Sequence, residues 1–166
     1  MAKPTTESIA LPDFPVTIVR ELDGNFIHDD ISLKELVTHT DKGLILYFYP
    51  KDNTPGCTAQ ACSLKDGNHE LLKADYQILG VSVDNELSHQ KFIKKHNLPF
   101  PLIADTDKKL VEEFGVWQEK TMMGRKYMGT IRTTFVVDEK GEIIHIISGR
   151  GVNTKEHADQ ILELEL

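Results

Sequence analysis

The chain has 166 residues, 40% of them hydrophobic and 27% charged, which is typical of one globular domain with a core of its own. We therefore expect a single domain over residues 1–166. A net charge of −7 without any basic cluster argues against nucleic acid as a partner. The N-terminal residues lack the apolar run of a signal peptide, and the longest apolar runs, such as 44–50, are too short to span a membrane. The sequence thus favours a cytoplasmic protein without a membrane partner.

Short apolar runs bounded by turn residues alternate along the chain with longer segments of helical pattern. In chain order, the sequence predicts strands at 15–20 and 25–28, a short helix from 32 to about 39, a strand at 44–49, a helix at 58–74, a strand at 77–83, a helix at 86–96, a short strand at 101–104, a short helix at 108–114, strands at 134–137 and 142–148, and a final helix at 154–164. The turn around Asp23-Gly24 makes the first two strands an N-terminal β-hairpin. Gly67-Asn68 is a weak point in the long helix. This order predicts an α/β fold with a central mixed β-sheet flanked by helices on both faces.

The only two cysteines, Cys57 and Cys62, lie where a predicted buried strand gives way to a helix. In a cytoplasmic protein such a pair is more often catalytic, redox-active or metal-binding than a static crosslink. Thr54 is a good N-cap residue, Pro55 suits the first helical position, and Gly56 allows a small molecule to approach the backbone. Cys57 then lies in the first helical turn, where the positive helix end favours a thiolate, the reactive form of cysteine.

A helix end alone does not ionise a thiol. At a pKa of about 8.5, roughly 3% of a thiol is ionised at pH 7, and about 90% ionisation needs about 3.4 kcal/mol of stabilisation. The helix end supplies about 0.3–1 kcal/mol, and up to ~2 kcal/mol in favourable sites. Unless hydrogen bonds to the sulfur supply the rest, a cation is expected near Cys57. Residue spacing does not choose among the four arginines, which are Arg20, Arg125, Arg132 and Arg150.

The spacing of the two cysteines sets a geometric limit. Five residues apart on one regular helix, their Cα atoms would be roughly 8–9 Å apart. A disulfide needs less than about 7 Å between Cα atoms, so Cys57 and Cys62 cannot bond across an intact helix. Either the helix unwinds when they join, as in a catalytic cycle, or they are two inert buried cysteines in a core helix.

The segment FYPKDNTPGCTAQAC, at 48–62, resembles the active-site segment of peroxiredoxins. Pro50, Thr54 and Cys57 fill the family motif Pro-x-x-x-Thr/Ser-x-x-Cys. A cysteine five residues after the first is the mark of the Q-type group, also called bacterioferritin comigratory protein. The resemblance covers nearly the whole chain. It includes LPDF at 11–14, similar to Ala-Pro-Asp-Phe with Leu11 in place of alanine, FGVW at 114–117, KYMG at 126–129 and the arginine-bearing strand RTTFVVD at 132–138.

The resemblance implies a thioredoxin-like fold and the reduction of hydroperoxides. Cys57 would be the peroxidatic nucleophile and Cys62 the resolving cysteine. Arg132 would be the missing cation, stabilising both the thiolate and the polarised peroxide oxygens. Thr54 would give its hydroxyl to the peroxide, or only cap the helix, and Pro50 would shield the pocket from water.

The resemblance also implies partners. Peroxide would oxidise Cys57 to a sulfenic acid, Cys62 would convert it to a disulfide, and a thioredoxin-like partner would reduce that disulfide. No metal or organic cofactor is required, and the seven histidines have no zinc-type spacing to the cysteines. Resolution within one chain favours a monomer.

Three other interpretations remain open. A general thiol–disulfide oxidoreductase would use Cys-x-x-Cys, whereas this chain has Cys-x-x-x-x-Cys. A non-enzymatic redox switch would form the same disulfide without turnover, and an inert domain would be alkylated only slowly at Cys57.

Trp117, Met122 and Met123 are expected to pack near the mouth of the pocket.

Overall fold

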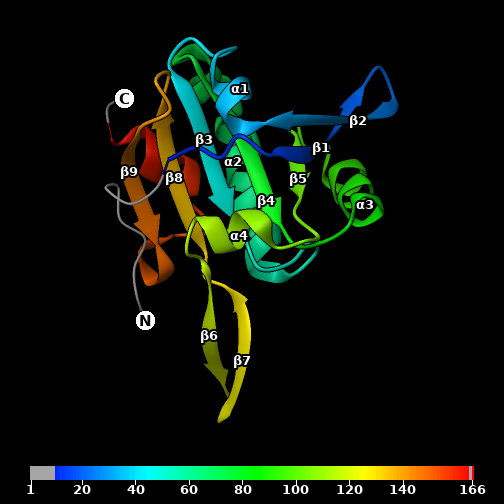
Figure 1. The fold of residues 1–166 in the computed structure, drawn as a ribbon, viewed down its shortest axis with the longest axis vertical. Helices are drawn as coiled ribbons and strands as arrows, with labels where there is room; N and C mark the ends of the chain where they lie inside the picture. The colour runs from blue at the N-terminus through cyan, green and yellow to red at the C-terminus, as the bar shows by residue number, and fades with distance from the viewer. Residues whose placement is uncertain (1–9, 165) are drawn as a thin grey trace.

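The computed structural model describes residues 10–164 and 166, and it contains a seven-stranded sheet with helices on both faces (Figure 1). The elements, in chain order, are β1 (Pro15–Leu22), β2 (Asn25–Ser32), α1 (Leu33–Val37), β3 (Gly43–Phe48), α2 (Pro55–Lys73), β4 (Tyr76–Ser82), α3 (Glu86–His96), β5 (Leu102–Ala104), α4 (Lys109–Glu113), β6 (Trp117–Met122), β7 (Arg125–Thr130), β8 (Thr133–Asp138), β9 (Ile143–Ser148), the 3-10 helix η1 (Gly149–Gly151) and α5 (His157–Leu162). The expected elements are all present, with ends that shift by a few residues, most of all in the shorter last helix.

The sheet is mixed, as expected. Its strand order is β2-β1-β5-β4-β3-β8-β9. The central strands β5, β4 and β3 run parallel, while β8 and β9 on one side and β1 and β2 on the other pair antiparallel. Parallel strands need a helical crossover between them, and α2 and α3 supply those crossovers. The end of β3 and the start of β8 are therefore neighbours, with Phe48 opposite Thr133.

The N-terminal β-hairpin is confirmed and is longer than expected. β1 and β2 pair from Pro15 opposite Ser32 to Leu22 opposite Asn25. The two residues between them, Asp23 and Gly24, both have positive φ values, 52° and 82°. This is the geometry of a two-residue hairpin turn whose twist matches that of the strands, and Asp-Gly is a favoured pair for it.

Each face of β3 packs into a separate core. Ile45, Tyr47 and Tyr49 belong to a core that includes residues of α2, α3 and α5. Leu44, Leu46 and Phe48 belong to a second core that includes residues of α1 and α4. Because successive side chains of a strand point to opposite faces, the continuous apolar run of β3 fills both cores.

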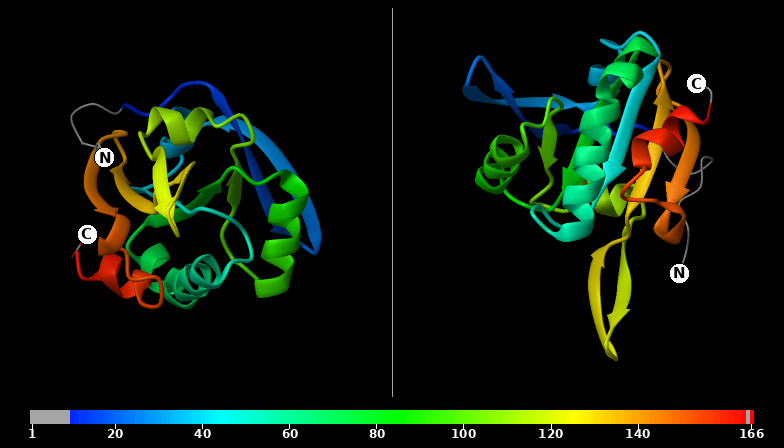
Figure 2. Two further views of the ribbon diagram at one scale, coloured as in Figure 1. Left: turned by 90° about the horizontal axis from the view of Figure 1, so that it is seen from below. Right: turned by 180° about the vertical axis from the view of Figure 1, so that it is seen from behind.

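The long helix α2 is continuous through Gly67-Asn68, so the expected weak point is absent. Gly67 instead permits a close approach between helices. A Cβ atom added at Gly67 would lie 2.4 Å from the Cβ atom of Ala158 in α5. The two helices lie side by side on the same face of the sheet (Figure 2, right).

The hairpin formed by β6 and β7, which we call the arm, is absent from the predicted elements. It projects away from the sheet (Figures 1 and 2), and most of its residues are exposed. Met122 and Met123 at its tip are 61% and 97% exposed, so the expectation that they pack at a pocket mouth is wrong. Trp117, at the base of the arm, packs beside the second core and beneath the ammonium group of Lys108. A strand pair with no buried face lacks the alternation by which strands are recognised in a sequence.

Candidate active site

Cys57 lies in the first turn of α2, as the sequence predicts. The helix begins at Pro55, and Thr54 occupies the N-cap position with extended backbone angles. Only 1% of Cys57 is exposed. The thiol therefore lies at the positive end of a 19-residue helix and is almost fully shielded from solvent.

The Thr54 side chain does not cap the helix, which corrects part of the sequence interpretation. Its hydroxyl donates to the backbone carbonyl of Lys51 at 3.0 Å, and it makes no side-chain cap hydrogen bond. The first turn is closed by the backbone instead, since the Thr58 N–H donates to the Thr54 carbonyl at 2.8 Å. The hydroxyl bond to Lys51 folds the segment between β3 and α2 into a tight turn that contains half-buried Pro50 at its start.

Arg132 is the arginine that lies beside Cys57. It immediately precedes β8, and the pairing of β3 with β8 brings it to the end of the sheet where α2 begins. Its Nη1 atom donates to the Cys57 Sγ atom at 3.4 Å. The guanidinium group is a permanent cation, so it supplies the charge that the helix end alone does not.

Gln60 belongs to the same constellation, and the sequence reasoning missed it. Its side-chain oxygen accepts from Arg132 Nη1 at 2.6 Å, and the residue is fully buried. Three residues after Cys57 on the same helix, it lies on the same side of α2. The three-residue spacing from Cys57 could have indicated Gln60 in the sequence. It identifies a site residue only once Arg132 is known to lie on that side of the helix.

Gly56 makes room for the cation. A Cβ atom at this position would lie 3.1 Å from Arg132 Nη2, closer than most Cβ contacts in proteins. The sequence suggested that Gly56 admits a small molecule, whereas in the structure the neighbour is the Arg132 side chain.

The charges of the site also contribute to the shifted pKa values of two further side chains, Lys120 and Tyr47. Burial, followed by the positive charge of Arg132, lowers the pKa of Lys120, which donates from the arm to the Thr130 carbonyl at 3.0 Å. Burial, followed by the charges of Asp52 and Cys57, raises the pKa of Tyr47 well above its usual value. Tyr47 is therefore a neutral phenol in the same buried core as Cys57.

Cys62 lies on the same unbroken helix, and both thiols are free. It is half-buried, in contrast to Cys57. The intact helix keeps the two sulfurs apart, in agreement with the geometric limit drawn from their spacing.

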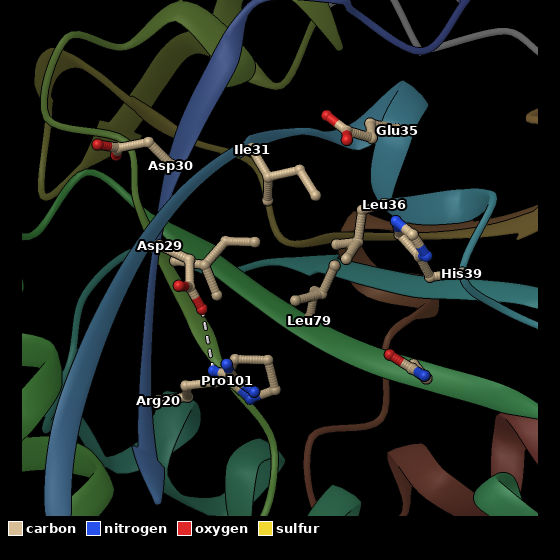
Figure 3. Close-up of a pocket in the computed structure, with 11 residues that line it drawn as sticks. Arg20, Asp29, Asp30, Ile31, Glu35, Leu36, His39, Leu79 and Pro101 are labelled. Carbon is tan, nitrogen blue, oxygen red and sulfur yellow. Dashed lines mark hydrogen bonds and ion pairs between the residues drawn. The ribbon is translucent and has the colours of Figure 1, made fainter.

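Two cavities of the described chain lie away from the cysteines. One of about 570 Å³ lies between the N-terminal hairpin, α1 and β4 (Figure 3). Its apolar floor includes Ile31, Leu36 and Leu79, and an ion pair between Arg20 and Asp29 spans its edge at 3.0 Å. Another, of about 640 Å³, lies beside residues 139–143 and α1. Neither is lined by a cysteine, so the constellation around Cys57 remains the candidate site.

The model of the AhpC/TSA family matches residues 9–146. The chain belongs to this family. It is 43% identical to peroxiredoxin Bcp of Bacillus subtilis over 129 residues, which is 78% of this chain and 81% of that protein. It is also 43% identical to peroxiredoxin Bcp of Escherichia coli K12 over 119 residues, which is 72% of this chain and 75% of that protein.

Solved structures give the same grouping. Peroxiredoxin Q of Xanthomonas campestris superposes with a TM-score of 0.79 at 34% identity, and the match covers 96% of each chain. The bacterioferritin comigratory protein of the same organism gives a TM-score of 0.78 at 33% identity, covering 94% of each chain. The thioredoxin-like fold and the membership of the Bcp and Q-type peroxiredoxins are thus confirmed, and the chain is a thiol-dependent peroxidase.

Metal-binding clusters and membrane-spanning helices are both missing from the described part of the chain. Among these residues, no group of three or more His, Cys, Asp or Glu side chains is arranged to hold a metal ion. Within the same residues, none of the helices combines the length and the apolar character that crossing a membrane requires.

Proposed function

We propose that Cys57 is the peroxidatic nucleophile of this peroxidase and that Arg132 is its activating cation. The observation that carries this assignment is the hydrogen bond of 3.4 Å from Arg132 Nη1 to Cys57 Sγ in the first turn of α2. The cation and the helix end both favour the thiolate, and burial keeps water from competing for their charge. Gln60, bonded to the same nitrogen, is a positioning residue that fixes the direction of the guanidinium group.

The first step of the proposed reaction is the oxidation of Cys57 by a hydroperoxide. The Cys57 thiolate attacks the terminal oxygen of a hydroperoxide ROOH, and the O–O bond breaks as the S–OH bond forms. The leaving RO⁻ takes up a proton, equal to the one released when the thiol ionised, and becomes ROH. The cysteine is thereby oxidised by two electrons to a sulfenic acid. Arg132 donates to the developing charge on the leaving oxygen, and the Thr54 hydroxyl becomes a second donor once it turns away from the Lys51 carbonyl. Pro50 shields the pocket on the side of the turn.

Cys62 then acts as the resolving cysteine. Its thiol attacks the sulfenic sulfur of Cys57, and water leaves as the intrachain disulfide forms. A thioredoxin-like dithiol reduces that disulfide and is itself oxidised. A redox switch without turnover is less well supported, because the relatives are named as peroxiredoxins.

The proposed substrates follow from a structural relative, and the proposed oligomeric state follows from the position of the two cysteines. The bacterioferritin comigratory protein of X. campestris, one of the structural relatives, has alkyl peroxide reduction activity. We extend this to hydrogen peroxide and organic hydroperoxides here. Since both cysteines lie on one helix, no second subunit is needed, and we propose a cytoplasmic, single-domain monomer.

Peroxide turnover by the wild type, Cys57→Ser and Cys62→Ser tests these assignments. Cys57→Ser should lose essentially all peroxide reduction with its fold intact, since serine is nearly isosteric. Cys62→Ser should consume one equivalent of peroxide and then stop with a thioredoxin system. Substantial turnover by Cys57→Ser would show that the nucleophile is assigned wrongly.

A further inference from the structure

A second charged constellation lies next to the active-site turn, and the reaction described above does not use it. His89 of α3 is fully buried. Its Nδ1 atom lies 2.7 Å from Asp52 Oδ2, and its Nε2 atom lies 2.9 Å from the backbone carbonyl oxygen of Ile103 in β5. Carboxylate and carbonyl oxygens accept hydrogen bonds. A neutral imidazole has a single N–H, so one of its nitrogens would direct a lone pair at an acceptor. With Asp52 ionised, both contacts are satisfied only by an imidazolium.

Asp52 is surrounded by donors. Tyr49 Oη donates to its Oδ1 atom at 2.5 Å, and Ser88 Oγ donates to its Oδ2 atom at 2.8 Å, beside His89. An ionised carboxylate accepts all three bonds, from Tyr49, Ser88 and His89. Burial, followed by the charge of Asp52, raises the pKa of Tyr49 well above its usual value, so that its hydroxyl remains a donor.

His157 provides a contrast within the same molecule. It is also fully buried, but its neighbours are Thr134 Oγ1 at 2.7 Å and Gln160 Oε1 at 2.9 Å. A hydroxyl can donate to Nε2 while Nδ1–H donates to the amide oxygen, so a neutral imidazole satisfies both contacts. Burial lowers the pKa of His157, which agrees with the neutral form.

The Asp52–His89 pair fastens the active-site turn to α3. Asp52 lies between Pro50 and Thr54, and its backbone N–H donates to Asp84 Oδ2 at 2.8 Å. The next residue, Asn53, has a left-handed φ of 62° and accepts from Lys95 Nζ at 2.9 Å. The turn that carries Pro50 and Thr54 is therefore held from the α3 side, independently of Cys57 and Arg132.

We propose that Asp52 and His89 form a buried imidazolium–carboxylate pair that positions the Pro50–Thr54 turn for attack on peroxide. Both are positioning residues, since neither touches the sulfur. Removing one partner leaves a buried charge uncompensated and loosens the turn. Thr54 and Pro50 then lose their alignment, while Arg132 and the helix end still act on Cys57. This inference rests on the function proposed for Cys57, Thr54 and Pro50.

The protonation of His89 can be measured directly. Two-bond ¹H–¹⁵N correlation spectra of the reduced protein at neutral pH should show both His89 ring nitrogens protonated, and one protonated nitrogen in His157. His89→Asn and His157→Gln assign the two sets of signals. A lone-pair nitrogen on His89 overturns the ionic pair. This measurement does not depend on which residue reacts with peroxide, so it separates failure of the ion pair from failure of the proposed function.

The positioning role is tested by two rates measured on the same variant, below its unfolding temperature. In Asp52→Asn, reaction of Cys57 with peroxide should slow by about 10- to 100-fold, the range expected of a misplaced reacting group. Alkylation of Cys57 by iodoacetamide should stay within about twofold of wild type, because it depends on the thiolate and not on peroxide alignment. Asp105→Asn is the matched control, since Asp105 is equally buried but binds the N–H groups of Leu110 and Val111 in α4.

Each outcome decides the role. Slower peroxide reaction with normal alkylation supports it. Two unchanged rates, or two rates that fall by the same factor, overturn it. If Asp52→Asn does not fold, His89→Asn serves in its place, because asparagine keeps a donor toward Asp52 but removes the charge and the bond to Ile103.

Discussion

The cationic partner of Cys57 is distant in sequence but close in space. Arg132 lies 75 residues further along the chain, and its Nη1 atom is 3.4 Å from the Cys57 Sγ atom. The contact is made by one guanidinium nitrogen that also donates to Gln60. One charged group therefore holds both the proposed nucleophile and the residue one turn later on α2. At this scale, the chemistry depends on where a single side chain points.

Removing that side chain should affect ionisation and reaction together. In Arg132→Ala, the reaction of Cys57 with peroxide should slow by about 10²- to 10³-fold, as when one preorganised donor is lost. The pH profile of iodoacetamide alkylation should move to higher pH, because the nearby positive charge that favours the thiolate is absent. Arg132→Lys should recover only part of the rate, since an ammonium group cannot reproduce the planar fork.

Arg125→Ala is the control for the loss of one positive charge, because Arg125 lies at the exposed tip of the arm. It should leave both measurements unchanged. An alkylation profile that does not move in Arg132→Ala would argue against the role of this arginine.

At the scale of elements, the proposed reaction cycle requires α2 to serve two states. It presents Cys57 in its first turn when the protein is reduced, yet its regular geometry separates Cys57 from Cys62. The proposed Cys57–Cys62 disulfide can form only if the helix unwinds locally. Its formation offsets the loss of a few backbone hydrogen bonds, each contributing about 1 kcal/mol.

Amide hydrogen exchange should detect this change. We expect residues 57–66 to be better protected in the reduced protein than in the disulfide form, whereas α3 should exchange equally in both. The Asp52 amide, bonded to Asp84, should also keep its protection. Equal protection of 57–66 in the two forms, with the Cys57–Cys62 bond confirmed, would rule out local unwinding.

The contact between α2 and α5 depends on the absence of one methyl group. Gly67→Ala should lower the free energy of unfolding by about 1–3 kcal/mol, because a Cβ atom 2.4 Å from the Ala158 Cβ atom forces the helices apart. The better helix propensity of alanine, about 1 kcal/mol, offsets only part of this. Chemical denaturation measures the change.

The second site of this contact supplies the control. In Gly67→Ala with Ala158→Gly, the crowding methyl group of Ala158 is removed, and most of the lost stability should return. A single Gly67→Ala variant more stable than wild type would mean that the helices separate without cost.

At the scale of the whole molecule, global stability is coupled to pH through buried His157. Burial lowers its pKa below the ordinary value of 6.5. At a pH between the lowered pKa of folded His157 and the ordinary pKa of the unfolded chain, the unfolded chain binds a proton that the folded chain does not. The free energy of unfolding therefore falls as pH falls through this range. Above the unfolded value this contribution is constant.

Urea denaturation from about pH 7.5 to about pH 5 should show this dependence, and His157→Gln should make it shallower. His69→Gln is the control, because His69 is an exposed residue of α2. A pH dependence in His157→Gln as steep as that of wild type would contradict the assignment.

The amino-acid sequence was sufficient to predict the order of the elements outside the arm, the N-terminal hairpin, the position of Cys57 in a first helical turn and the inability of an intact helix to join it to Cys62. These are local properties, set by apolar periodicity, turn residues and helix geometry over a few neighbouring positions. The resemblance to peroxiredoxins also pointed to Arg132, which spacing alone did not select among the four arginines.

Which distant groups meet depends on the tertiary structure. The pairing of β3 with β8 brings Arg132 to Cys57, and the packing of α3 beside the active-site turn joins His89 to Asp52, 37 residues away in sequence. The close approach at Gly67 and the exposed arm likewise had no signature in the chain. Contacts between distant segments depend on strand order and helix packing, and a one-dimensional pattern reports only which face of its own element a residue occupies.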